Sequence, residues 1–65
     1  MTYMEWIESF CFPVEIEVVN TDDDIIYSGD IRKAPRIYEG LVIEEQYTKR
    51  NEDGSGVFGA IVREV

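Results

Sequence analysis

Apolar and polar residues alternate along residues 14–19, the pattern of a strand with one buried and one solvent-facing side. Val14, Ile16 and Val18 fall on the apolar side, and Glu15 and Glu17 fall on the other side. The run NTDDD follows, and Asn and Asp favour turns because their side chains bond to the nearby backbone. A second β-rich run, IIYSG, comes next. The two runs predict an antiparallel hairpin.

A short helix is predicted ahead of this hairpin. Thr2 and Glu5 have the spacing of a capping box, and Pro13 cannot continue a helix. Trp6 lies off the apolar stripe, so it is either at the edge of the core or exposed. The most economical interpretation of Cys11, the last member of the stripe, is a small buried hydrophobic residue. The stripe has helical spacing and consists of Tyr3, Ile7, Phe10 and Cys11.

The second half of the chain predicts two further strands. Pro35 excludes a regular ladder between residues 30 and 40, so a loop or one helical turn is expected there. The run LVIEEQYT predicts a third strand, but both of its faces mix apolar and polar residues, which leaves its inward face open. A polar loop follows, and VFGAIVREV predicts the last strand, with Gly59 as a bulge or a point of close backbone approach. We therefore expect one α+β domain over residues 1–65: a short N-terminal helix packed on a four-stranded, mainly antiparallel sheet, in the order α-β-β-β-β.

Composition narrows the cellular setting. At 45% hydrophobic residues the chain is too apolar to be disordered despite its net charge of −8. Cys11 is the one cysteine, so no internal disulfide can form, which favours a reducing cytoplasm. The N-terminus lacks the pattern of a signal peptide, and no run is long enough to span a bilayer. A negative surface also opposes binding to nucleic acid or anionic lipid, so an electrostatic partner is expected to be basic.

The negative charge comes from the first half of the chain. Residues 32–65 carry six acids and six bases, which cancel. Residues 1–31 carry no base and eight acids: Glu5, Glu8, Glu15, Glu17, Asp22, Asp23, Asp24 and Asp30. This asymmetry is the strongest functional signal in the sequence.

No metal, cofactor or catalytic site is expected. Asn20, Asp22 and Asp24 have the first three spacings of an EF-hand loop, but Ile25 and Ile31 occupy the positions that need Gly and an acid. The chain has no His, the commonest general base, and no basic residue near Cys11 that would activate its thiol. The glycine-rich GSG is not followed by the Lys-Ser/Thr of a phosphate-binding loop. The residues therefore point away from an enzyme.

A protein-binding surface is the remaining expectation. Glu15 and Glu17 should project from one strand face roughly 6–7 Å apart, and the turn acids should extend that line. Trp6, Tyr27 and Tyr38 are the candidate aromatic anchors of such a surface. We expect a basic protein surface as the partner, for example that of a nucleic-acid-binding protein, at a site comprising Glu15, Glu17, Asp22, Asp23, Asp24 and Trp6.

Two other interpretations stay open. The acids can be a solvated surface that prevents aggregation, with the aromatic residues in the core. Alternatively, the protein is a small structural module that forms a homodimer through an edge strand, for which the apolar run at residues 57–65 is the candidate.

The segment IIYSGDIRKAPRIYEGLVIEE, with the helix and strand before it, resembles a group of small uncharacterised proteins of Gram-positive phages and integrative elements. The resemblance implies a mobile-element setting, in which small acidic proteins often inhibit host defence, as anti-CRISPR proteins that mimic DNA do. It implies no catalytic activity. It extends over about residues 3–45 and is carried by Tyr27, Gly29, Ile31, Pro35, Val42 and Ile43.

Overall fold

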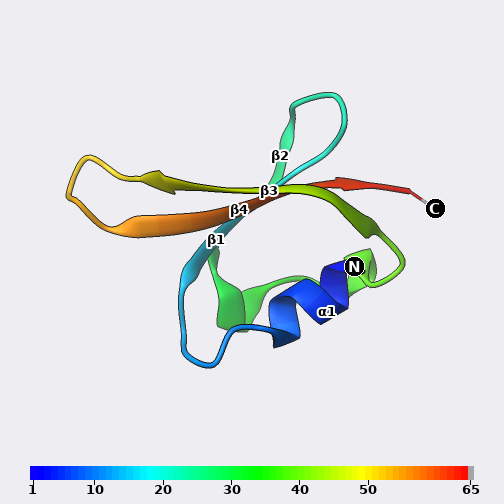
Figure 1. The fold of residues 1–65 in the computed structure, drawn as a ribbon, viewed down its shortest axis with the longest axis horizontal. Coiled ribbons are helices and arrows are strands. Elements are labelled where there is room, and N and C mark those ends of the chain that lie inside the picture. The colour runs from blue at the N-terminus through cyan, green and yellow to red at the C-terminus, as the bar shows by residue number, and fades with distance from the viewer. Residues whose placement is uncertain (65) are drawn as a thin grey trace.

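The computed structural model describes residues 1–64 and has the expected α+β order, a helix followed by four strands (Figure 1). Two short 3-10 turns occupy the segment around Pro35, where a helical turn was one of the two predicted alternatives. The elements are α1 (Tyr3–Glu8), β1 (Glu15–Val19), β2 (Ile25–Asp30), η1 (Ile31–Lys33), η2 (Arg36–Tyr38), β3 (Val42–Arg50) and β4 (Gly56–Arg63).

The strands form one sheet in the order β2-β1-β4-β3. The predicted hairpin of β1 and β2 is confirmed, and β3 and β4 form a second antiparallel hairpin. The central pair, β1 and β4, is parallel. The expectation of an edge strand at residues 57–65 was therefore wrong for the described part of that run, because β4 lies inside the sheet between β1 and β3. The edges are β2 and β3.

The helix ends at Glu8, three residues before the last residue of the predicted apolar stripe. Its capping box is confirmed: the Glu5 backbone N–H donates to Thr2 Oγ1 at 3.2 Å, and the Thr2 N–H donates to Glu5 Oε1 at 2.9 Å. After Glu8, the Ser9 hydroxyl donates to the carbonyl of Trp6 at 2.6 Å and closes the last turn. Cys11 consequently lies beyond the helix and is exposed, which corrects its expected burial.

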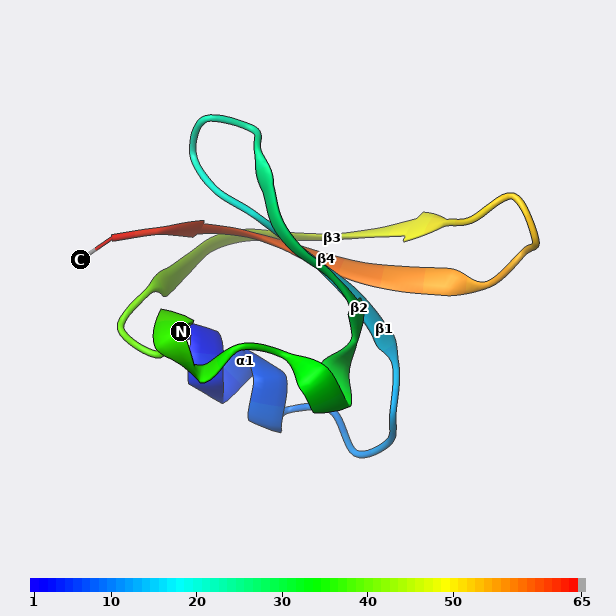
Figure 2. The same ribbon diagram turned by 180° about the vertical axis from the view of Figure 1, so that it is seen from behind.

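The core lies between one face of the sheet and the layer formed by α1 and the 3-10 turns (Figures 1 and 2). Tyr3 and Trp6 supply the helix side of this core. The strand side is supplied by Ile16 and Val18 of β1 and by Ala60 and Val62 of β4. No helix of the described chain covers the opposite face of the sheet, which we call the open face.

A β-bulge decides which side chains of β3 face the core. The register between β3 and β4 shifts between Ile43 and Glu45, so one extra residue, Glu44, is accommodated there. Ile43 pairs with core residue Val62 and packs on the core, whereas Tyr47 pairs with Gly59 and lies on the open face. Strict alternation along β3 would place Ile43 and Tyr47 on the same side of the sheet, and the bulge is the reason that they lie on opposite sides. Gly59 is the point of close approach, because a Cβ added there would overlap the Tyr47 ring.

Candidate functional site

Glu17 is a buried carboxylate of the open face and is only 6% exposed. Tyr47 Oη donates to its Oε2 at 2.5 Å, and Lys49 Nζ donates to its Oε1 at 2.6 Å. The hydrogen bonds from Lys49 and Tyr47 lower the pKa of the Glu17 carboxyl, and burial together with this carboxylate raises the pKa of Tyr47 to about 12. Glu17 therefore serves the fold, which corrects its expected place on a partner-binding surface. The feature of the sequence that could have indicated this burial is Gly59, because the absence of a side chain there leaves room for the Tyr47 ring.

Glu17→Gln should make the stability of the fold less dependent on pH. Because the pKa of Glu17 is lower in the folded state, its ion pair stabilises the fold above the normal carboxyl pKa. This contribution is lost as the pH falls through the lowered folded pKa. We expect the variant to lose about 1–3 kcal/mol near pH 7 and less near pH 3, measured by chemical denaturation across that range. A loss that is equal at both pH values would contradict this role of Glu17.

Trp6 is also unavailable to a partner, because it is 2% exposed. Its ring packs edge-on against Phe10, with 5.5 Å between the ring centroids. It lies three residues after Tyr3, so both side chains share the buried face of α1. Its expected role as an exposed anchor is corrected to that of a core residue.

The remaining predicted acids do not form one surface. Glu15 begins β1 and accepts a hydrogen bond from Asn51 Nδ2 at 3.0 Å. Asp22, Asp23 and Asp24 lie beyond the other end of β1, roughly 16 Å of strand away. The helix acids Glu5 and Glu8 lie on α1, which both views show well apart from the turn after β1 (Figures 1 and 2). The structure thus keeps the three aspartates together and separates them from the other acids.

Residues 20–24 form a tight turn, which we call the acidic turn. Asn20 Oδ1 accepts hydrogen bonds from the backbone N–H groups of Asp22 at 2.9 Å and Asp24 at 3.0 Å. Asp23 adopts a positive φ of 65°, which Asp tolerates better than most residues. All three carboxylates are exposed. Within residues 1–64 the ion pairs are Arg32–Asp30 and Lys49–Glu17, so these three carboxylates have no basic partner there.

Asn20→Ala should destabilise the acidic turn. The substitution removes the acceptor of two backbone N–H groups, and we expect a loss of about 1 kcal/mol in the free energy of unfolding. Chemical denaturation measures it. Thr21→Ala is the matched control, because no hydrogen bond of the Thr21 side chain occurs in the described structure, and it should change stability by less than about 0.5 kcal/mol. Equal effects of the two substitutions would contradict the role of Asn20.

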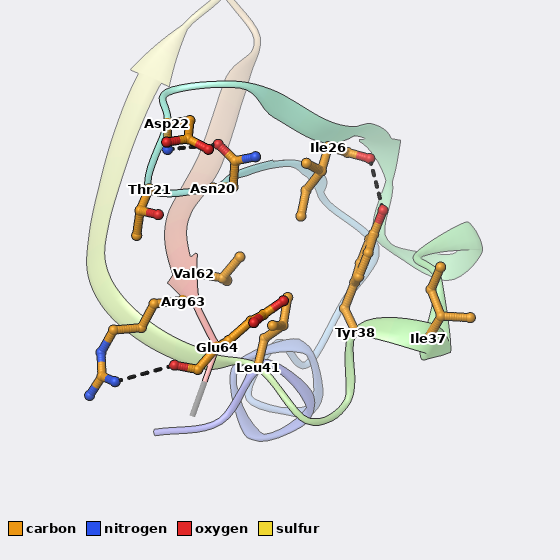
Figure 3. Close-up of a pocket in the computed structure, with 10 residues that line it drawn as sticks. All are labelled: Asn20, Thr21, Asp22, Ile26, Ile37, Tyr38, Leu41, Val62, Arg63 and Glu64. Carbon is orange, nitrogen blue, oxygen red and sulfur yellow. Dashed lines mark hydrogen bonds between the residues drawn. The ribbon is translucent and has the colours of Figure 1, made fainter.

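The acidic turn forms one wall of a groove of about 650 Å³ (Figure 3). Its apolar side chains, Ile26, Tyr38, Leu41 and Val62, come from β2, from η2 and the segment after it, and from β4. The Tyr38 hydroxyl donates to the carbonyl of Ile26 at 3.3 Å and holds η2 against β2. Beyond Tyr38, the side chain of Ile37 is 82% exposed. This volume is within the range of ligand-binding clefts, ~300–1,000 Å³.

The parallel pairing of β1 and β4 creates this groove. Parallel strands end at the same edge of a sheet, so the acidic turn after β1 comes to lie beside the C-terminal end of β4. Val62, Arg63 and Glu64 therefore line the groove together with Asn20 and Asp22. The sequence patterns did not predict that the first and last strands pair, so they did not place the acidic turn beside the end of β4. For that reason the sequence indicated the turn acids but not the groove beside them.

No protein-family model, no curated protein and no solved structure matches the chain. Within the described residues, no three His, Cys, Asp or Glu side chains are placed to hold a metal ion together. No helix among residues 1–64 is long and apolar enough to cross a membrane.

Proposed function

We propose that the protein is a non-enzymatic interaction protein that binds a basic segment of a partner protein in the groove beside the acidic turn. One observation carries the proposal: Asp22 lines a groove with an apolar floor, and Asp23 and Asp24 lie on the same exposed turn, where none of the three carboxylates has a basic partner within residues 1–64. An apolar floor supplies contact area, and the carboxylates supply the orientation and the attraction.

The charges around the groove define the preferred ligand. Asp22 lies on one wall, whereas Arg63 lies near the C-terminal end of β4, where its guanidinium donates to the Glu64 carbonyl at 3.5 Å. A Lys or Arg of the partner is attracted to the first wall, whereas the second wall carries both Arg63 and Glu64, whose opposite charges offset each other. The favoured segment therefore has one apolar side chain for the floor and basic side chains directed toward the acidic turn.

A basic, cytoplasmic nucleic-acid-binding protein is the partner class that we favour. Its basic surface would be attracted to a chain with a net charge of −8, and this chain has a single cysteine that suits a reducing compartment. The resemblance to proteins of phages and integrative elements supports an inhibitory role, in which the acidic turn competes with phosphates for that surface. Such binding should weaken as salt screens the charges, since the Debye length falls from ~10 Å at 0.1 M to ~3 Å at 1 M.

Amide substitutions at the three aspartates test the proposal. The triple variant Asp22→Asn, Asp23→Asn, Asp24→Asn should bind basic peptides roughly tenfold more weakly, because exposed ion pairs each contribute about 0.2–1 kcal/mol. The probe is a set of synthetic peptides with one apolar residue between two Lys or Arg residues, and the readout is fluorescence anisotropy at low and high salt.

The matched control removes the same three charges elsewhere. Glu8, Glu44 and Glu52 are exposed, lie outside the groove and make no side-chain hydrogen bond within residues 1–64. Their triple Gln variant has the same net charge as the aspartate variant, so it should keep nearly the full affinity. If both variants lose affinity equally, the acids act only through net charge and the groove is not the site.

A further inference from the structure

The free edge of β3 is a second surface of the molecule that lacks a neighbour. The N-terminus covers its first part: Ile43 N–H donates to the Met1 carbonyl at 2.8 Å, and Tyr3 N–H donates to the Leu41 carbonyl at 2.9 Å. Backbone hydrogen bonds to the N-terminus end at Ile43, and beyond them the Met1 sulfur accepts a hydrogen bond from Gln46 Nε2 at 3.8 Å. From residue 45 to residue 50, no strand of the described chain lies outside β3.

The hairpin geometry shows which backbone groups point outward along this edge. At the hairpin end, Asn51 N–H donates to the Ser55 carbonyl at 2.8 Å, so residue 51 directs its backbone groups toward the β4 side. In an antiparallel ladder this direction alternates. Tyr47 and Lys49 therefore bond toward β4, whereas Gln46 and Thr48 present their N–H and C=O groups to the free edge. These outward groups need a partner strand or water.

Residues of opposite charge lie at equal distances on the two sides of Tyr47, the centre of this free edge. An acid, Glu45, lies two residues before Tyr47, and a base, Lys49, lies two residues after it. A second copy of β3 that runs antiparallel with Tyr47 opposite Tyr47 places each Glu45 opposite a Lys49. The same register places Gln46 opposite Thr48, and these are the residues whose backbone groups point outward. Shifting the register by two residues in either direction loses the Glu45–Lys49 pairs.

We propose that two copies of the protein pair through residues 45–49 of β3 about a two-fold axis at Tyr47, which joins two four-stranded sheets into one continuous sheet. The charge complementarity identifies the occupant of the edge as a second copy rather than a foreign strand. The other edge strand, β2, offers less, because the Tyr38 hydroxyl already occupies its Ile26 carbonyl. This interface is separate from the groove and does not depend on the proposed function.

The side chains of this segment are free to make the contacts. Glu45 is exposed, and its side chain makes no hydrogen bond within residues 1–64. The Lys49 side chain is 47% exposed, and its ammonium has two further hydrogens besides the one donated to Glu17. The Tyr47 rings do not block the two-fold axis, since each lies over Gly59 of its own chain. Lys49 of each copy thus bridges its own Glu17 and Glu45 of the second copy.

Three variants test the interface by sedimentation over a range of protein concentrations. Wild type should dimerise. Glu45→Lys places two like-charged pairs in the interface and should weaken dimerisation roughly tenfold or more. Thr48→Pro removes an outward N–H that is not used within the monomer and should abolish the dimer, whereas Thr48→Val keeps that N–H and should leave it intact. A wild-type monomer at every concentration, or Thr48→Pro and Thr48→Val dimers of equal strength, would overturn the proposal.

Cross-linking tests the register. In a Cys11→Ser background, Gln46→Cys and Thr48→Cys proteins should form a mixed disulfide when oxidised together, because opposite residues of such a pair lie ~5.5 Å apart between Cα atoms. Gln46→Cys alone should stay uncross-linked, since position 46 faces position 48 and the two copies of position 46 are diagonal neighbours ~7–8 Å apart. Efficient cross-linking of Gln46→Cys with itself would show a different register and reject this interface.

Discussion

Trp6→Ala should leave the protein largely unfolded at room temperature. Trp6 is 2% exposed and is the largest of the fully buried side chains. Truncating such a residue costs about 3–5 kcal/mol. A domain of this size has about 3–10 kcal/mol of stability in total. The six-residue helix α1 also has no stability of its own without the packing that Trp6 supplies. Far-UV circular dichroism and chemical denaturation measure the loss.

Phe12→Ala is the matched control for this substitution. Phe12 is an aromatic residue just beyond the same helix, but it is 64% exposed. Its removal should change stability by no more than about 0.5 kcal/mol. A Trp6→Ala protein that folds with wild-type stability and fails only in partner binding would show that Trp6 is a surface anchor, contrary to its observed burial.

The second large effect is expected at Gly59. A Cβ at this position would overlap the Cζ and Cε2 atoms of Tyr47. Gly59→Ala therefore forces the ring away from the open face, and the ring then withdraws its hydroxyl from the buried Glu17 carboxylate. Overpacking and the lost hydrogen bond together should cost about 2–4 kcal/mol in chemical denaturation.

Two comparisons isolate this mechanism. Gly56 lies on the same strand, and a Cβ added there would have no atom within 4 Å, so Gly56→Ala should be nearly neutral. In a Tyr47→Ala background the obstacle is gone, and Gly59→Ala should then cost much less than in the wild type. Additive effects of Tyr47→Ala and Gly59→Ala would mean that the ring and the glycine do not interact as the structure indicates.

Local patterns in the sequence were sufficient for several parts of the fold. The capping box at Thr2 and Glu5 is confirmed because its chemistry lies within one helical turn. The hairpin of β1 and β2 is confirmed because alternation and the turn chemistry around Asn20 act over neighbouring residues. The close approach at Gly59 was one of two predicted alternatives, and the structure selects it.

Pairings between distant segments could not be predicted in the same way. The parallel contact of β1 with β4 joins residues about forty positions apart, and no local pattern specifies it. The bulge at Glu44 moves Ile43 to the core face and defeats simple alternation. The burial of Glu17 depends on both of these features, because its neighbours Tyr47 and Lys49 come from the second hairpin. The alternation of residues 14–19 alone predicts that Glu17 is exposed.

The proposed binding site likewise has one part that the sequence indicated and one part that depends on distant strand pairing. The sequence indicated Asp22, Asp23 and Asp24 as binding residues, and the structure places them together on one exposed turn. The groove beside them depends on the distant pairing of β1 with β4, so the sequence could not reveal its apolar floor.

A two-dimensional ¹⁵N NMR titration tests the central claim most directly. The probe is a short synthetic peptide with a leucine between two arginines, added to the wild type and to the triple Asn variant of the acidic turn. We predict that wild-type shift changes concentrate at Asn20, Asp22, Ile26, Tyr38 and Val62, weaken with salt, and largely disappear in the variant. Shift changes that map elsewhere, or that are equal in the wild type and the variant, would contradict the groove as the binding site.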